Sequence, residues 1–338
     1  GYATRSLKEC LALAGKDYEV LTPILDARFV CGWSLIYANL LDELRQKIIV
    51  KKSRHIINWL VENNESRHAH FGDSAYLLEP NLKEGQGGLR DYHTMLWIAR
   101  IAFNAKHARD LEYLGHLSHE EFQTLSRSIA FIWNVRNRIH YICGRKCDQL
   151  HFENQVKLAR SLNYKKNNGQ EAVERLMGEL HGKMEALKQQ HLVFLHELGY
   201  EKIRKRKRKS QKKSAVEGLE VIKWGMLNFG GPEAIIKKPE LLMKIFEESA
   251  RLKIPLSAEA KRLVKEFSHL ANKAYRTSEP VVKTFERTLV APAPKFNVLN
   301  EMLNTRFLEK FIPELGGVRN PIQYAAYHLY PVAKHLLR

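Results

Sequence analysis

The sequence predicts a mainly α-helical protein, and three features of the chain support this prediction. Apolar residues recur every three or four positions over most of the 338 residues, which is the spacing of helices with one buried face. Helix-capping patterns precede several of these stretches. Runs with the character of strands are few and short. We therefore expect a helical bundle with a short isolated strand and a β-hairpin.

The composition is that of a folded, basic protein. Hydrophobic residues make up 44% of the chain, and 55 Lys and Arg stand against 37 Asp and Glu, for a net charge of +18. This charge favours phosphate-bearing partners, acidic proteins or anionic membrane surfaces without choosing between them. Four cysteines are too few for a disulfide scaffold, and Cys143 with Cys147 has no second pair to complete a zinc site.

Two further features concern location and boundaries. No stretch approaches the ~20 apolar residues that span a bilayer, and the N-terminus lacks the pattern of a signal peptide. We therefore expect a soluble, cytoplasmic protein without a membrane partner.

The chain starts at Gly1, and its last residues, Lys334–Arg338, keep an apolar periodicity with no stop signal. We expect both ends to be cut.

The first part of the chain, from Leu7 to His70, predicts helices with short breaks. We place these breaks at Gly32 and at residues 51–53. The apolar run 75–78 is too short for a helix and precedes Pro80, so it predicts an isolated strand followed by a loop.

Three long amphipathic helices follow and imply a bundle. The first begins behind the glycines of residues 85–88, the second behind a capping box of Ser118 and Glu121, and the third covers residues 170–198. Trp97 and Trp133 are interpreted as core anchors. Polar residues on the second helix favour a buried hydrogen-bond network over catalysis, and they are Arg136, Asn137, Arg138 and His140.

A basic run separates this region from the rest of the chain. Residues 202–213 hold nine Lys or Arg in twelve positions, which favours a solvated linker and a domain boundary. Nonspecific nucleic-acid binding through this run is the alternative, although no aromatic residue lies inside it to stack on bases.

Beyond the basic run the sequence predicts a hairpin and then helices. The hairpin pairs residues 219–222 with 224–229, punctuated by glycines. Pro239 is placed at the first position of a helix, and Ser257 at the cap of the next. Further helical patterns cover residues 280–289, 296–308 and 322–337.

The most informative motif runs from a predicted strand at Tyr76–Leu78 through a glycine-rich loop into a helix. Glycines permit close backbone approach, and the free N–H groups of a helix N-terminus suit a phosphate or carboxylate. Lys83 and Arg90 would add charge-assisted contacts. From these residues alone, a plain connection between elements remains the favoured alternative.

Residues 79–97, which read E-P-N-L-K-E-G-Q-G-G-L-R-D-Y-H-T-M-L-W, resemble the signature of the bifunctional PII uridylyltransferase/uridylyl-removing enzyme family. Three further regions are similar to the same family. They are residues 1–10, residues 133–140, and residues 311–319 with 327–332.

The resemblance implies a function for the intact protein. The family transfers UMP from UTP to a tyrosine of the PII signalling protein, and its HD domain hydrolyses the product when glutamine, the effector, is plentiful. Transfer resembles polymerase-β-like chemistry, in which three carboxylates hold Mg²⁺ ions. The G-S turn with its D-x-D pair, which supplies two of these carboxylates, is not found in these residues. We therefore expect this fragment to be inactive alone.

The resemblance also implies a division of the chain. Residues 1–105 would be the C-terminal part of the nucleotidyltransferase unit, whose sheet edge would contain the predicted strand. Residues 106–201 would be a helical bundle, 202–215 the basic linker, 216–318 a hairpin with helices, and 319–338 the start of the HD domain. The alternative function is a noncatalytic, basic helical module that binds PII or nucleic acid, although nucleic acid is the less favoured partner.

The resemblance implies several site residues. Glu79 is the candidate third carboxylate, with a structural alternative in which it caps the loop or pairs with Arg90. His335 would be a ligand to the divalent metal of the HD domain, whose site is incomplete here, and Ala333 departs from the family's acidic residue. His68, His70 and Asp73 are interpreted as surface residues rather than a metal site. The candidates for a nucleotide or phosphate loop are Asn81, Lys83, Gly87, Gly88, Arg90 and Asp91.

Overall fold

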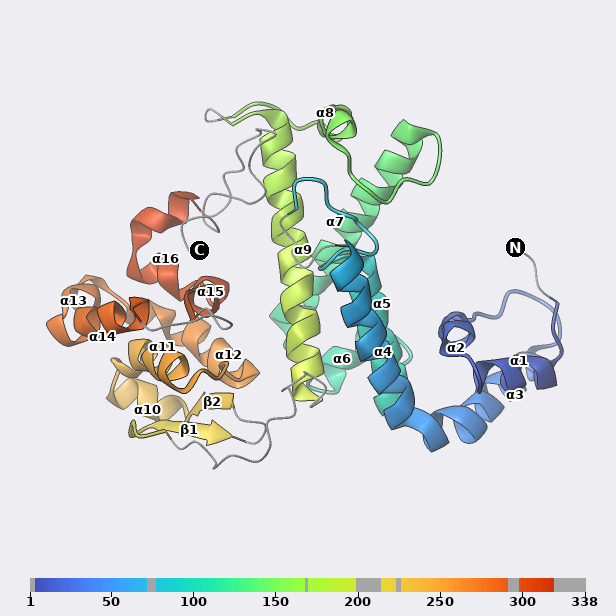
Figure 1. The fold of residues 1–338 in the computed structure, drawn as a ribbon, viewed down its shortest axis with the longest axis horizontal. Helices are drawn as coiled ribbons and strands as arrows, with labels where there is room; N and C mark the ends of the chain where they lie inside the picture. Colours follow the sequence, from blue (N-terminus) through green and yellow to red (C-terminus); the bar gives the residue numbers. More distant parts are fainter. Residues whose placement is uncertain are drawn as a thin grey trace. The chain divides into compact units, whose positions relative to one another are not determined.

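The computed structural model describes residues 4–71, 77–167, 170–198, 214–222, 226–290 and 298–318 (Figure 1). The chain divides into two compact units, residues 1–200 and 201–338, which are described separately. Helices dominate both units, and the strands of the described residues form one two-stranded antiparallel sheet. The mainly α-helical prediction is confirmed.

Unit 1 begins with three helices. Ser6 starts α1 (Leu7–Ala14) with a capping box, Asp17 caps α2 (Tyr18–Leu25), and α3 covers Ser34–Leu44. The break predicted at Gly32 is confirmed, and its φ of 103° is one that glycine adopts readily.

The break predicted at residues 51–53 is wrong. The chain continues from α3 through a π-helical turn, Arg45–Ile49, into α4 (Val50–Phe71) without interruption. Ile48 and Ile49 before this segment, and Ile56 and Ile57 after it, are all buried, whereas the two lysines are exposed. A continuous buried face therefore outweighs the local break signal.

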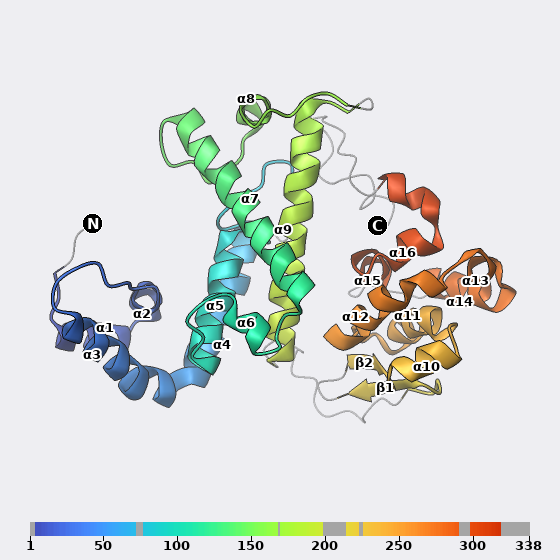
Figure 2. The same ribbon diagram turned by 180° about the vertical axis from the view of Figure 1, so that it is seen from behind.

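The remaining helices of unit 1 form the predicted bundle. They are α5 (Leu89–Phe103), α6 (Asp110–Tyr113), α7 (His119–Cys143), α8 (Phe152–Ser161) and α9 (Ala172–Glu197). Ser118 and Glu121 form the expected capping box at α7. In Figures 1 and 2, α4, α5, α7 and α9 lie side by side, and α7 and α5 both contact α9.

The strand predicted before the glycine loop is not present where the chain is described. Residues 72–76 lie outside the described ranges, and Leu77 and Leu78 are not in a strand. The local β contact is a single bridge between Asn81 and Gln149. Side chains rather than a neighbouring strand satisfy the carbonyls here, since Gln155 Nε2 donates to the Leu78 carbonyl at 2.7 Å.

Unit 2 opens with the hairpin, whose strands β1 (Leu219–Ile222) and β2 (Met226–Phe229) pair in antiparallel register. The hairpin prediction is confirmed. The helices that follow are α10 (Pro232–Lys237), α11 (Leu241–Leu252), α12 (Ala258–Glu266), α13 (Lys273–Thr277), α14 (Glu279–Leu289), α15 (Val298–Asn304) and α16 (Phe307–Phe311), with two 3₁₀ turns, Phe267–Leu270 and Pro313–Val318.

Two helix details of unit 2 differ from the predictions. Pro239 precedes α11 within a turn rather than beginning it, and Pro232 occupies the first turn of α10 instead. The pattern at 296–308 is divided between α15 and α16, because Arg306 adopts a left-handed φ of 59°. Ser257 caps α12 as predicted. The pattern at 322–337 lies outside the described residues.

The core of unit 2 is apolar and centres on α11. Phe246 is fully buried, and its ring stacks on that of Phe307 with centroids 5.4 Å apart. The hairpin closes one side of this core, where Leu227 exchanges backbone hydrogen bonds with Pro255 and Ser257. In the described part of the chain, every helix falls short of the length and apolarity that a membrane crossing requires.

Candidate functional site

The glycine-rich loop, residues 79–88, is folded tightly onto itself and onto α9. Asn81 Oδ1 accepts hydrogen bonds from the backbone N–H groups of Lys83 at 3.1 Å and Glu84 at 2.7 Å. The Gly85 N–H donates to the Asn81 carbonyl at 3.1 Å. Asn81 is itself buried, so its side chain organises the turn instead of facing solvent.

Gly87 and Gly88 are required by close backbone packing. Gly87 has φ +74°, and a Cβ built there would lie 2.1 Å from the Met184 carbonyl oxygen of α9. A Cβ on Gly88 would lie 2.8 Å from two carbonyl oxygens of the same loop. These glycines therefore let the loop approach α9 and close on itself.

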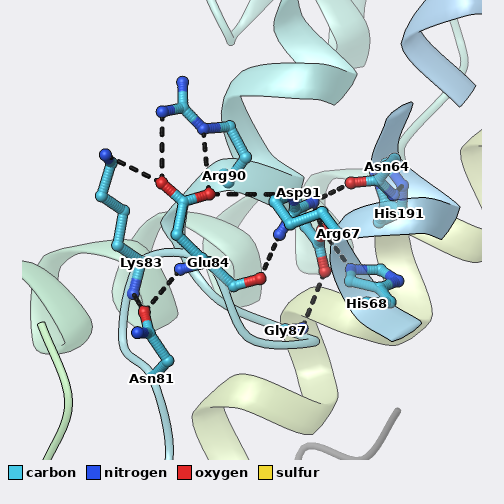
Figure 3. Close-up of polar contacts among 10 residues, drawn as sticks. All are labelled: Asn64, Arg67, His68, Asn81, Lys83, Glu84, Gly87, Arg90, Asp91 and His191. Atoms are coloured by element: carbon cyan, nitrogen blue, oxygen red, sulfur yellow. Dashed lines mark hydrogen bonds and ion pairs between the residues drawn. The ribbon is translucent and has the colours of Figure 1, made fainter. Parts of the chain in front are cut away.

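Asp91, in the first turn of α5, is the centre of a buried polar network (Figure 3). Its Oδ1 accepts from Arg67 Nη2 at 2.6 Å and pairs with His68 Nε2 at 2.8 Å. Its Oδ2 accepts the Gly87 N–H at 2.7 Å. Asp91 thus ties α4, the glycine loop and α5 together, and we call Asn64, Arg67, His68, Asp91 and His191 the Asp91 network.

The network extends to α9. Arg67 also donates to the Asn64 side chain and to the Glu84 carbonyl, and the Asn64 amide bonds His191 Nε2 at 2.9 Å. His191 and Asn64 are both buried. A buried charge costs several kcal/mol unless it is paired and hydrogen bonded, and this arrangement provides both for Asp91.

The pKa values of the network follow from these contacts. Burial raises the pKa of Asp91, but the His68 hydrogen bond and then the charges of His191, His68 and Arg67 outweigh it and lower the value to about 2. Burial lowers the pKa of His191 to about 4, against a smaller opposing effect of Asp91. At neutral pH, Asp91 is therefore ionised and His191 is neutral.

A second cluster surrounds Glu84. Its carboxylate pairs with Lys83 Nζ at 2.8 Å and with Arg90 Nη2 at 3.3 Å, and both cations are partly exposed. Burial raises the pKa of Glu84, but the hydrogen bonds and charges of Lys83 and Arg90 produce a net lowering. Arg90 also lies over the Trp97 ring, 5.5 Å from its centroid.

The loop's backbone donors are largely occupied inside the protein. The N–H groups of Lys83, Glu84, Gly85, Gly87, Gly88 and Arg90 each donate to an acceptor within residues 81–91. The structure therefore favours a structural role for these groups over backbone binding of an anion. A nucleotide role for Asn81, Lys83, Gly87, Gly88, Arg90 and Asp91 stays a prediction, resting on the partly exposed cations Lys83 and Arg90.

Glu79 is held by the start of α8. Its Oε1 accepts the Phe152 N–H at 2.7 Å, and His151 Nδ1 lies 3.6 Å from the same atom. Its side chain is 37% exposed. Glu79 thus caps α8, and Arg90 pairs with Glu84 rather than with Glu79. Its other carboxylate oxygen could still face a ligand, so its catalytic role stays a prediction.

Four successive carbonyls fix the backbone around Glu79. Those of residues 77 to 80 accept hydrogen bonds from His181 Nε2, Gln155 Nε2, Gln149 Nε2 and the Leu150 N–H, respectively. These donors come from α9, α8 and the segment before α8. Burial lowers the pKa of His181 to about 4, so it is a neutral donor at pH 7.

The described residues do not form a complete metal site. No group of three His, Cys, Asp or Glu side chains among them is arranged to hold an ion. Glu79 could supply one oxygen, whereas Mg²⁺ in proteins takes further ligands from carboxylates, substrate phosphates or water. His335 and Asp73 lie outside the described residues, and His70 is exposed.

Sequence reasoning missed four members of the site, Arg67, His68, Glu84 and His191. His68 was interpreted as a surface residue, but its side chain is only 14% exposed and pairs with Asp91. The positions of Arg67 and His68 on α4 do not predict their contact with Asp91, because Asp91 lies more than twenty residues further along the chain. The available clue was Asp91, an acidic residue of the signature that lies on the buried side of α5 and therefore needs a partner.

The polar residues of α7 form the expected network in part. Arg136 Nε donates to Asp148 at 2.7 Å, and His140 Nε2 lies 3.1 Å from the same oxygen. Asn137 and Arg138 are exposed instead. Trp97 is buried, as a core anchor should be, with its Nε1 donating to Asp26 at 2.8 Å, whereas Trp133 is half-buried.

Comparison with known proteins agrees with the resemblance seen in the sequence. Residues 55–195 match the family model of the GlnD PII-uridylyltransferase. The whole chain is 28% identical, over 347 residues, to the bifunctional uridylyltransferase/uridylyl-removing enzyme of Ruegeria pomeroyi. It spans 37% of the length of that relative. No solved structure matches the chain.

The matched segment contains the whole site described above, from Arg67 and His68 to His191. The resemblance inferred from the sequence is thereby confirmed: residues 55–195 are similar to the GlnD PII-uridylyltransferase family.

Proposed function

We propose that the chain is part of an enzyme that transfers UMP from UTP to a tyrosine of PII and removes it by hydrolysis. The observation that supports this function is the signature of residues 79–97, which lies within the matched segment and folds as one interlocked unit. PII and UTP are the proposed partners, and glutamine the proposed effector. The chain spans 37% of its relative, so this activity belongs to a longer protein.

Within that enzyme, we assign the Asp91 network to scaffolding and Glu79 to chemistry. Asp91, Gly87 and Asn81 direct their polar groups inward to the loop, and the carbonyls flanking Glu79 are fixed from α8 and α9. The Glu79 carboxylate is therefore presented from a rigid support. Mg²⁺, when bound, would polarise the UTP phosphates, and Glu79 would contribute one of its oxygen ligands.

A uridylylation assay with labelled UTP and PII tests this function. The 338-residue chain alone should transfer no UMP, because the G-S turn and D-x-D pair that would supply two metal-binding carboxylates are not found in its sequence. In the full-length protein that contains this chain, Glu79→Gln should reduce transfer by roughly the 100-fold that a lost outer-shell metal contact can cost. Hydrolytic removal of UMP should persist.

Thermal unfolding of the Glu79→Gln variant supplies the control. Because the side chain is partly exposed, the melting temperature should change little, which separates a catalytic loss from an unfolded protein. Unchanged transfer by this variant would show that Glu79 only caps α8. Labelling of PII by the 338-residue chain alone would refute the inactivity of the fragment.

A further inference from the structure

Two cysteines lie on either side of the turn that ends α7. Cys143 is the last residue of α7, and Cys147 lies four positions further along the chain. Between them, Gly144 adopts a left-handed φ of 63°, which commonly ends a helix and redirects the chain. Both thiols are free and partly exposed.

The chain turns back toward the face of α7 that carries Cys143. Arg136, His140 and Cys143 share this face, because they are spaced by four and then three positions along the helix. Asp148, directly after Cys147, lies over the same face. Its Oδ1 accepts a hydrogen bond from Arg136 Nε at 2.7 Å and lies 3.1 Å from His140 Nε2. These contacts bring Cys147 back to the end of α7, beside Cys143.

The two cysteine side chains interact with each other. Burial raises the pKa of Cys147, and the neighbouring Cys143 raises it further through hydrogen bonding and charge. Cys147 is therefore a protonated thiol at neutral pH. Among the described residues, no third His, Cys, Asp or Glu joins the two thiols in a metal site. The pair is thus placed for a reaction between its own two sulfur atoms.

The surroundings of the pair favour access by an anionic oxidant. The three residues between the cysteines, Gly144, Arg145 and Lys146, are all exposed. Partly exposed cysteines beside cations are the ones that commonly take part in thiol chemistry. Glutathione disulfide has a net negative charge at neutral pH, so Arg145 and Lys146 would attract it.

We propose that Cys143 and Cys147 form a reversible disulfide, with a low-molecular-weight disulfide such as glutathione disulfide as the oxidant. The Cys143 thiolate attacks one sulfur of glutathione disulfide and expels a glutathione thiolate, which leaves a mixed disulfide on Cys143. Cys147 then loses its proton and attacks the Cys143 sulfur, which expels the second glutathione. The two protein thiols are oxidised, one glutathione disulfide is reduced, and the two protons go to the glutathione thiolates. This exchange does not depend on the proposed transfer of UMP.

The turn that carries the pair is bonded to the signature loop. Cys147 Sγ donates to the Gln149 carbonyl at 3.2 Å, and Gln149 Nε2 donates to the Glu79 carbonyl. The Leu82 N–H donates to the Asp148 carbonyl at 2.8 Å. A disulfide has no S–H group, so oxidation removes the first of these hydrogen bonds. We therefore expect disulfide formation to weaken the contacts between the turn and the loop.

Peptide mapping of the full-length protein that contains this chain tests the proposal. The protein is incubated with glutathione disulfide, free thiols are alkylated, and trypsin then cleaves after Arg145 and Lys146. Both cleavage sites lie between the two cysteines, so the peptides that carry Cys143 and Cys147 separate in the reduced protein. We expect these peptides to stay linked after oxidation and to separate again when dithiothreitol is added.

Two variants test the order of attack, and a third cysteine is the control. Cys147→Ser should stop at the mixed disulfide between Cys143 and glutathione, whereas Cys143→Ser should leave Cys147 largely as a free thiol. Cys31 is exposed and should take up glutathione without forming a linked peptide. Absence of the Cys143–Cys147 link at a glutathione disulfide concentration that modifies Cys31 would overturn the proposal.

Hydrogen exchange of the reduced and oxidised proteins tests the effect on the signature loop. The Leu82 amide should exchange faster in the disulfide form, because its acceptor lies in the turn that the disulfide alters. The Leu227 amide of unit 2, which donates to the Pro255 carbonyl at 3.0 Å, is the control and should not change. Equal exchange of the Leu82 amide in both forms would refute the link between the disulfide and the loop.

Discussion

The two units bury polar groups in opposite ways. In unit 1, buried polar side chains join residues that are far apart in sequence, such as Asn64 with His191 and Gln155 with Leu78. In unit 2, buried hydroxyls mostly bond carbonyls of their own helix, as Thr284 does with Pro280 and Thr288 with Thr284, both at 2.8 Å. The polar network of unit 1 joins distant elements, whereas the buried threonine hydroxyls of unit 2 bond locally. The Ser257 hydroxyl, which donates to the Asn228 side chain, is a long-range exception in unit 2.

This difference shows which polar residues specify the fold. A long-range buried pair fixes how elements are placed, and its loss leaves the partner buried and unpaired. A hydroxyl bonded within its own helix can be replaced without stranding any group. The signature of the family lies in the unit of the first kind, in which the glycine loop, α4, α5 and α9 meet.

The largest effect is expected for Asp91→Ala. This change removes the closer of the two carboxylate partners of Arg67, whose Nε remains 3.8 Å from Glu84 Oε2. Breaking a buried pair costs about 3–5 kcal/mol. Urea unfolding followed by tryptophan fluorescence should show the loss in unit 1, which contains Trp33, Trp59, Trp97 and Trp133. The exposed Asp42→Ala is the control and should change stability by less than about 0.5 kcal/mol. Equal losses of stability in Asp91→Ala and Asp42→Ala would show that the buried long-range pairs of unit 1 do not specify its fold.

A somewhat smaller effect is expected for Gly87→Ala, measured against Gly115→Ala. The two glycines have nearly equal φ values, +74° and +78°, so both variants carry the left-handed backbone cost of about 1–2 kcal/mol. Only at Gly87 would the new methyl group meet the Met184 carbonyl, whereas nothing lies within 4 Å at Gly115.

Overpacking of this kind adds about 1–3 kcal/mol. The free energy of unfolding, measured in urea, should therefore fall further for Gly87→Ala than for Gly115→Ala. Indistinguishable values would show that the loop does not pack against α9 as described.

Acid should weaken unit 1 through its buried histidines. The pKa values of His181 and His191 are lowered to about 4 in the folded protein, so between the unfolded value of about 6.5 and pH 4 the unfolded chain binds more protons. Stability must then fall as the pH falls through this range, by about 1.4 kcal/mol for each histidine and each pH unit. Urea unfolding at several pH values measures this slope.

His191→Gln should reduce the pH slope of stability, and His55→Gln, at an exposed position, should leave it unchanged. Asp91 titrates at lower pH, since its folded pKa of about 2 lies below the ordinary value. Its contribution is lost only as the pH falls below about 4, which separates it from the histidines. A slope that survives His191→Gln intact would assign the acid sensitivity elsewhere.

The smallest effect is expected for Thr288→Val in unit 2. The Thr288 hydroxyl is buried and bonds the Thr284 carbonyl of its own helix, so replacing it with a methyl group strands no other polar group. The cost should stay below about 1 kcal/mol in urea unfolding or hydrogen exchange of α14. A loss as large as that of Asp91→Ala would show that local bonding does not make a buried polar group replaceable.

Much of the local structure followed from the sequence. The capping box at Ser118, the cap at Ser257, the hairpin and the start of α5 behind Gly88 were predicted from short-range patterns, and each is present. Local rules failed where a longer-range contact outweighs them. The helix continues through residues 51–53 because apolar residues on both sides are buried.

The site was predicted less completely, because its partners are distant in sequence. The signature identified Asp91 and the glycines, but not that Asp91 faces Arg67 and His68 of α4. Glu79 was given a capping alternative, and it does cap an element, namely α8 rather than its own loop. No spacing within residues 76–91 encodes a bond to Phe152.

The sequence by itself determined the helical class, the helix starts and the family signature, because caps, periodicity and glycine requirements act over a few residues. Only the tertiary structure decided which polar groups are buried, since burial of Asp91 and the lowered pKa of His191 arise when α4, α5 and α9 come together. It also showed that Phe29, Val30 and Trp33, large apolar residues between α2 and α3, are exposed. Exposure depends on what packs against a segment, and a local pattern carries no information about that contact.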